Sequence, residues 1–105
     1  MSTTNSEAGD ISAKPNTASA RTTIRNKYGF HVRPSTSFSQ LAATFSSDIQ
    51  VTAGEMTADA KSIIGLLTLG ALCGTSITIN AKGDDAAAAV QALKELVESS
   101  FNGIE

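Results

Sequence analysis

One histidine, His31, stands in the segment Gly29-Phe30-His31-Val32-Arg33-Pro34-Ser35, and its neighbours indicate what it could do. Apolar residues recur at helical spacing over the residues that follow, which predicts a helix from about 35 to 45. Pro34 suits the first helical position, because the N–H that proline lacks would have no partner there. His31 and Arg33 therefore flank a helix N-terminus, a natural anion site. Such a site could place a phosphoryl group on a ring nitrogen and release it again.

Two structural alternatives stay open for these residues. His31 could be a buried or capping side chain of the core, and Arg33 could be a solvated surface cation. The clustering of imidazole, guanidinium and free amide groups favours phosphoryl chemistry, because a neutral imidazole is nucleophilic near pH 7. Arg33 can donate a fork of N–H groups to phosphoryl oxygens.

Ser62 is a second candidate site, at the start of a short predicted helix over residues 63–69 that Gly70 would close. As an N-cap, Ser62 would accept a hydrogen bond from a helix amide, and this structural role alone explains its identity. A phosphate on it would add about −1.5 to −2 charge at a helix N-terminus, which tolerates negative charge. Two interpretations of Ser62 remain open: a helix cap alone, or a helix cap that is also a regulatory phosphorylation site.

The same helix predicts a docking surface, because five large aliphatic side chains in seven positions cannot all lie under one sheet. We expect Ile64 and Leu67 to face solvent beside His31, with Val32 nearby and Lys61 in a reduced basic rim. An exposed apolar patch with a polar rim is typical of a protein-docking surface. The alternative is that all five side chains belong to the core.

Composition limits the class of protein. The chain has 105 residues and a formal net charge of −2, without a basic stripe or aromatic platform, which argues against nucleic-acid binding. The single cysteine, Cys73, excludes an intramolecular disulfide; it is expected to be a small buried or half-buried apolar residue, with a redox thiol as the alternative. With no apolar run of spanning length and no secretory h-region, we expect a cytoplasmic protein that does not enter the membrane.

The pattern of apolar residues predicts the strands and helices that position these candidate residues. Residues 1–20 are poor in large apolar side chains and are expected to form a flexible tail; residues 21–105 form one domain. Strands are predicted at 21–25, 48–52, 56–59 and 76–81, and a last helix begins after Asp84 or Asp85 and carries its apolar stripe to Phe101. The order βαββαβα predicts an α+β sandwich with one sheet face covered.

From Arg21 to about Ser100 the sequence resembles HPr, the histidine-containing phosphocarrier of the bacterial sugar phosphotransferase system. The resemblance rests on GFHVRPS around His31, AKSIIGLLTLG from Ala60, and GTSITINAKGDD from Gly74, in the family's order and spacing. It implies an open-faced sandwich, a four-stranded antiparallel sheet with three helices on one face. It also implies that His31 is the phosphorylated histidine and Arg33 the active-site arginine.

The resemblance further implies partners. Enzyme I, charged from phosphoenolpyruvate, would phosphorylate His31, and enzyme IIA domains would receive the group for sugar uptake. Ser62 matches the serine that an HPr kinase/phosphorylase modifies in many lineages. The chain would then be a monomeric carrier with a phosphohistidine intermediate rather than a stand-alone catalyst, with no cofactor and no metal.

Two other functions stay open from the sequence. One is a regulatory relative, in a nitrogen-type or incomplete system, that signals rather than feeds transport. The other is a ferredoxin-like ligand or RNA module, which would need aromatic strand faces that this chain lacks. Departures from the familiar pattern bear on partners: Tyr28 stands where many members have Asn or Ser, and no lysine lies between Val32 and Met56.

Overall fold

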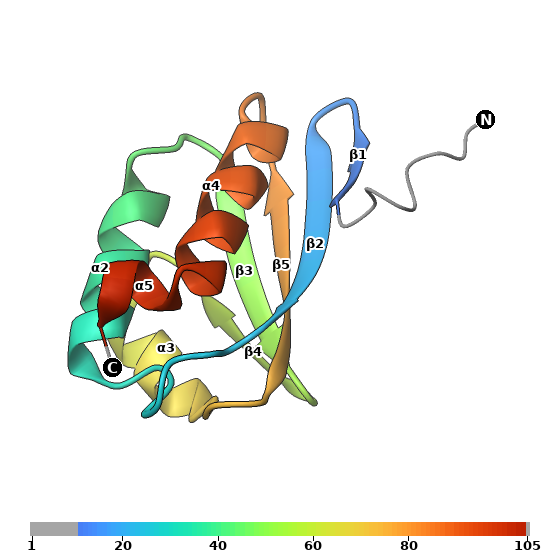
Figure 1. Ribbon diagram of the computed structural model, residues 1–105. Helices are drawn as coiled ribbons and strands as arrows, with labels where there is room; N and C mark the ends of the chain where they lie inside the picture. Colours follow the sequence, from blue (N-terminus) through green and yellow to red (C-terminus); the bar gives the residue numbers. More distant parts are fainter. Residues whose placement is uncertain (1–10, 105) are drawn as a thin grey trace.

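The computed structural model describes residues 11–104 as one five-stranded antiparallel sheet with helices on one of its faces (Figure 1). The sheet order is β1-β2-β5-β3-β4, and every neighbouring pair is antiparallel. In chain order the elements are β1 (Ile11–Lys14), β2 (Thr17–Thr23), α2 (Val32–Ala43), β3 (Asp48–Ala53), β4 (Met56–Asp59), α3 (Ile63–Leu69), β5 (Ser76–Lys82), α4 (Ala86–Glu98) and α5 (Ser100–Gly103). The expected open-faced α+β sandwich is confirmed, with one further strand at its start and one further helical turn at its end.

Side-chain alternation in the central strands decides which sheet face is covered. Ala18, Ala20 and Thr22 of β2 are buried and stand opposite Ala81, Ile79 and Ile77 of β5, which are also buried. Their sequence neighbours on both strands point to the other face and are more exposed. The core therefore lies between one face of the sheet and the helices, as period-2 alternation requires.

The predicted boundary at residue 20 is wrong. Residues 11–14 and 17–23 form a hairpin, so residues 11–20, expected in a flexible tail, belong to the sheet, and the first predicted strand begins four residues too late. Small side chains such as Ala18 and Ala20 carry little strand signal. Pairing of β2 with β5 fixes their conformation instead, because it satisfies the backbone groups of both strands. The other residues of the predicted tail, 1–10, lie outside the described part of the chain.

Two element ends also differ from expectation, and one helix start matches it without the expected cap bond. α2 begins at Val32 rather than near Ser35, so Pro34 is its third residue rather than its first. α4 begins after Asp85, whose carboxylate makes no cap bond within the helix and instead accepts hydrogen bonds from Ser46 and Ser47. After Glu98 the chain leaves the α4 axis through left-handed conformations at residues 100–102.

Among the described helices, none is both long and apolar enough to cross a membrane.

Candidate functional site

The loop before α2 is closed by hydrogen bonds within itself. The side-chain amide of Asn26 donates to the carbonyl of Gly29 (2.8 Å), and the same carbonyl accepts from the His31 amide (2.9 Å). The Gly29 amide returns a bond to the Asn26 carbonyl (3.3 Å). Asn26 is 1 % exposed, so these bonds are formed away from solvent. The backbone that carries His31 is therefore held in one conformation.

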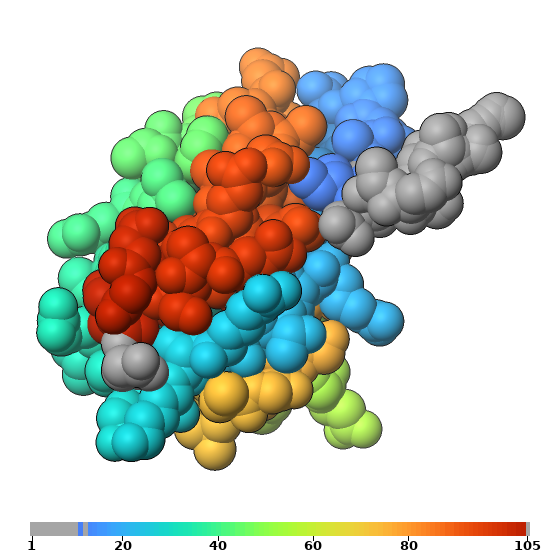
Figure 2. All heavy atoms as spheres, viewed as in Figure 1, coloured from blue at the N-terminus to red at the C-terminus, as the bar shows by residue number. Residues whose placement is uncertain are grey.

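Gly29 fits this loop for two reasons. Its φ is +61°, a left-handed conformation in which a side chain is strained. A Cβ at this position would also lie 2.0 Å from the carbonyl oxygen of Ala71. The close approach lets the Phe30 amide donate to that same oxygen at 3.0 Å. The loop is thus docked on the segment that follows α3, and Figure 2 shows the loop, in cyan, against the yellow-orange residues after α3.

Phe30, directly before His31, anchors the loop in the core. Its ring packs edge-on against Phe38 of α2 with centroids 5.2 Å apart, and it meets Phe101 of α5 at 5.6 Å. All three phenylalanines are buried. Aromatic pairs of this geometry add to the free energy of burial. The position of His31 therefore depends on α2 and on the last helical turn of the described chain.

His31 is the N-cap residue of α2, which confirms its predicted place just ahead of a helix N-terminus. Its carbonyl accepts the first bond of the helix from Ser35 (3.0 Å), while its imidazole makes no cap bond. The ring is partly exposed, but its Nε2 atom is shielded from solvent and has no hydrogen-bond partner among the described residues. Of the two ring nitrogens, only Nε2 is shielded in this way.

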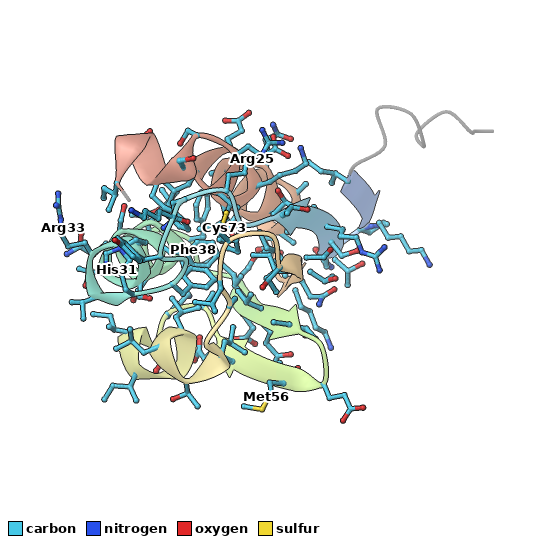
Figure 3. All side chains as sticks on the ribbon, turned by 60° about the horizontal axis from the view of Figure 1, so that its bottom comes forward. Arg25, His31, Arg33, Phe38, Met56 and Cys73 are labelled. Atoms are coloured by element: carbon cyan, nitrogen blue, oxygen red, sulfur yellow. The ribbon has the colours of Figure 1, made fainter. Side chains whose placement is uncertain are left out.

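The electrostatics at this end of α2 favour an anion. The first turn contains no acidic side chain, so nothing there neutralises the positive end of the helix dipole. The amides of Val32 and Arg33 have no acceptor within the helix, as at any helix N-terminus. Arg33 is exposed, projects outward at the same end as His31 (Figure 3), and forms no ion pair within residues 11–104. Its guanidinium adds a second positive group at this end of α2.

Ser62 is confirmed as the N-cap of α3. Its Oγ accepts a hydrogen bond from the Gly65 amide at 2.9 Å, and Gly70 closes the helix with φ +63°. Lys61, expected in the basic rim, is only partly exposed and donates its ammonium to the Phe45 carbonyl at 2.8 Å. Its side chain therefore joins the segment before α3 to the end of the α2 region, a structural role that the sequence did not indicate.

The apolar side chains expected at the surface do face solvent. Ile64 is 75 % exposed, Val32 60 % and Leu67 36 %, whereas Leu66 of the same helix is fully buried. The division of α3 into one inward and several outward aliphatic side chains confirms that the helix cannot hide all of them. Ile63, the first residue of α3, is exposed as well, and so are Tyr28 and Leu72 outside this helix. Cys73, expected to be buried or half-buried, is also exposed, so that expectation is wrong.

The sequence alone did not identify two residues that support the His31 loop from the protein interior, Asn26 and Phe101. The sequence places Asn26 only in a loop; the available signal is an Asn three residues before a glycine, a combination typical of turns. Phe101 was placed on the stripe of α4, but the left-handed turn after Glu98 brings it onto Phe30 instead. No local pattern indicates that turn, because Ser100, Phe101 and Asn102 all adopt positive φ without glycine.

Comparisons with known proteins agree with this geometry. The family model described as "PTS HPr component phosphorylation site" matches residues 18–99, which leaves β1 outside the match. The multiphosphoryl transfer protein of Xanthomonas campestris pv. campestris is 44 % identical over 99 residues that cover 91 % of this chain. The chain spans only 12 % of that protein's length.

Two further relatives match over most of their own length. Phosphocarrier protein NPr of Shewanella violacea is 42 % identical over 76 % of this chain and 88 % of the relative. The crystal structure of HPr-C-His from Thermoanaerobacter tengcongensis superimposes with a TM-score of 0.79 at 39 % identity, covering 83 % of this chain and 98 % of that one.

Proposed function

Because this chain belongs to the HPr family of phosphotransferase-system phosphocarriers, we propose that it accepts a phosphoryl group on His31 from phospho-enzyme I and passes it to enzyme IIA domains for sugar uptake. The observation that carries the proposal is the placement of His31 as N-cap of α2, beside free helix amides and the exposed Arg33. The proposed role is that of a carrier, since the chain would act only together with a donor and an acceptor protein, and its proposed location is the cytoplasm.

The proposed chemistry uses Nδ1. With the ring proton on the shielded Nε2, the Nδ1 lone pair attacks the phosphorus of the donor's phosphoryl group. A new N–P bond forms, and the bond from phosphorus to the donor breaks with its electron pair left on the donor. The amides of Val32 and Arg33 and the Arg33 guanidinium stabilise the phosphoryl oxygens. In onward transfer a nucleophile of enzyme IIA attacks the phosphorus, and the N–P bond breaks with its electron pair returned to Nδ1. The anion site must therefore bind the group without trapping it.

The test is phosphorylation with phosphoenolpyruvate and enzyme I. The parent chain should acquire an acid-labile, base-stable label, the signature of a phosphorus–nitrogen bond. His31→Ala should acquire none, and a persisting label would refute the assignment. Arg33→Ala should slow transfer while the melting temperature stays nearly constant, because the side chain is exposed and unpaired in the described chain. A large fall in melting temperature would instead make Arg33 structural.

A regulatory, nitrogen-type role is the second candidate, and the 42 % identity to phosphocarrier protein NPr supports it. Both roles require the same phosphohistidine and differ in the acceptor. Phosphorylated chain should therefore be offered to a sugar-type and a nitrogen-type enzyme IIA domain in parallel. Faster transfer to the sugar-type domain supports the first proposal, and faster transfer to the nitrogen-type domain replaces it with the second.

Ser62 is proposed as a regulatory phosphosite for an HPr kinase/phosphorylase as well as a helix cap. The support is its half-buried Oγ at the α3 N-terminus, on the helix that also exposes Ile64 and Leu67. Ser62→Asp should keep the helix, since Asp is an equally good cap, and should slow phosphorylation of His31 by adding negative charge to the docking face. Equal transfer rates for the two folded proteins would leave Ser62 a cap alone.

The docking surface for these partners is proposed to be the exposed apolar group of Val32, which follows His31 in the sequence, and Ile64 and Leu67 of α3, the helix that packs against α2. Burial of these side chains against a partner would remove water from the phosphoryl group and strengthen its contact with Arg33. The free carrier is proposed to be a monomer. Lys61 enters this surface only through its partly exposed stem, because its ammonium is bound to Phe45.

A further inference from the structure

Tyr28 stands next to the imidazole in an arrangement that the proposed function does not yet use. Its ring centroid lies 5.8 Å from that of His31, and the two ring planes are nearly perpendicular, at 87°. The Lys27 ammonium lies 5.2 Å from the centroid of the same tyrosine ring. Tyr28 is 55 % exposed, so little of the core depends on it. Edge-to-face contacts of this kind are attractive and directional.

The imidazole itself is not held by hydrogen bonds. Within residues 11–104 its Nε2 has no partner, and the ring makes no capping bond to α2. A ring without hydrogen bonds could turn about its side-chain torsions, and such a turn would carry Nδ1 away from the amides of the helix N-terminus. Packing must therefore supply the restraint, and Tyr28 provides the aromatic contact that His31 makes in the described chain.

The backbone below Tyr28 is fixed independently of its side chain. The neighbouring Gly29 amide donates to the Asn26 carbonyl, and the Asn26 side chain donates to the Gly29 carbonyl. Tyr28 lies within this closed turn, so its Cα keeps its distance from His31. The tyrosine ring can therefore act on the imidazole from a constant position.

We infer that Tyr28 is a positioning residue for His31, whose ring holds the imidazole with Nε2 inward and Nδ1 toward the phosphoryl donor. This inference rests on the proposed phosphoryl transfer. An edge-to-face contact changes an equilibrium between two ring orientations by about two- to twelvefold. Loss of the tyrosine ring should lower the rate constant of transfer within the complex by a factor in that range.

Two variants of the full chain separate the ring from the hydroxyl. Tyr28→Phe keeps the aromatic contact, whereas Tyr28→Leu keeps an apolar side chain without it. Both should melt close to the parent temperature because the residue is largely exposed. In the unphosphorylated proteins, NMR should show the His31 ring protons unmoved in Tyr28→Phe and displaced in Tyr28→Leu. With enzyme I, Tyr28→Phe should match the parent, and Tyr28→Leu should show a kcat reduced about two- to twelvefold.

Ile64→Ala provides the contrast for a docking effect, since its expected change is a raised KM rather than a lowered kcat. An unchanged kcat in Tyr28→Leu would overturn the inference, and so would a Tyr28→Phe variant as slow as Tyr28→Leu. If the parent chain takes no phosphoryl group, the proposed function fails and the inference fails with it. A labelled parent with an unchanged Tyr28→Leu refutes the inference alone.

Discussion

Substitution of Gly29 by alanine should destabilise the domain far more than the same change at Gly54, although both glycines have nearly the same backbone angle. Their φ values are +61° and +62°. At Gly54 an added Cβ meets nothing within 4 Å, whereas at Gly29 it would lie 2.0 Å from the Ala71 oxygen and 2.7 Å from the Leu72 Cα. Gly54→Ala therefore measures backbone strain alone, whereas Gly29→Ala measures backbone strain together with steric crowding.

The expected magnitudes follow from these contacts. Alanine in the left-handed region costs about 1–2 kcal/mol, partly offset by the stiffer unfolded chain, so Gly54→Ala should lower the free energy of unfolding by about 1 kcal/mol. At Gly29 the backbone of residues 71 and 72 must also move, an overpacking cost of about 1–3 kcal/mol. The Phe30–Ala71 hydrogen bond, worth about 0.5–1.5 kcal/mol, would be strained or lost. Gly29→Ala should therefore cost about 3–5 kcal/mol.

Urea unfolding of the parent and both variants measures this difference, with the slope m checked for constancy. In thermal melts, Gly54→Ala should fall by about 4–8 °C and Gly29→Ala by more than about 12 °C. Phosphorylation of His31 should slow in Gly29→Ala even where the protein is still folded, because the loop is displaced, and should be unaffected in Gly54→Ala. Equal losses of stability at the two positions would refute the claim that the loop is held by its close approach to Ala71.

Three further outcomes are expected. The pKa of Asp85 is lowered from 3.8 to about 2 by hydrogen bonds, first from the Ser47 hydroxyl and then from the Ser46 amide. The ionised Asp85 therefore stabilises the folded state fully above about pH 4, and this stabilisation is lost as the pH falls toward 2. The parent should melt above Asp85→Asn at neutral pH, and the difference in melting temperature should shrink between pH 4 and 2. A difference that stays constant over this interval would contradict the prediction. Phe101→Ala should cost about 3–5 kcal/mol in urea unfolding because the ring is fully buried; a loss below 1 kcal/mol would show that the last helical turn does not support the core. Lys61→Met should lower the free energy of unfolding by about 1 kcal/mol, because the hydrogen bond to the Phe45 carbonyl is lost. An unchanged free energy of unfolding would show that Lys61 has no structural role and serves only in docking.

The sequence alone predicted several helix ends, because these depend on interactions between residues that are close together in the chain. The helix N-terminus after His31, the Ser62 cap and the Gly70 closure each follow from side chains within a few residues, because capping and turn preferences act over that range. The exposure of Ile64 follows from the simple excess of aliphatic residues in a seven-residue helix.

The tertiary structure decided what depends on distant segments. The conformation of residues 11–20 comes from the pairing of β1 with β2 and of β2 with β5, since alanine and serine have little strand preference of their own. Lys61 was expected at a partner surface, but its ammonium is bound to a carbonyl sixteen residues earlier. Phe101 reaches Phe30 only through a left-handed turn that packing stabilises. Contacts between segments far apart in the chain leave no local periodicity in the sequence, so only the folded chain shows that the histidine loop is held from behind by Ala71 and Phe101.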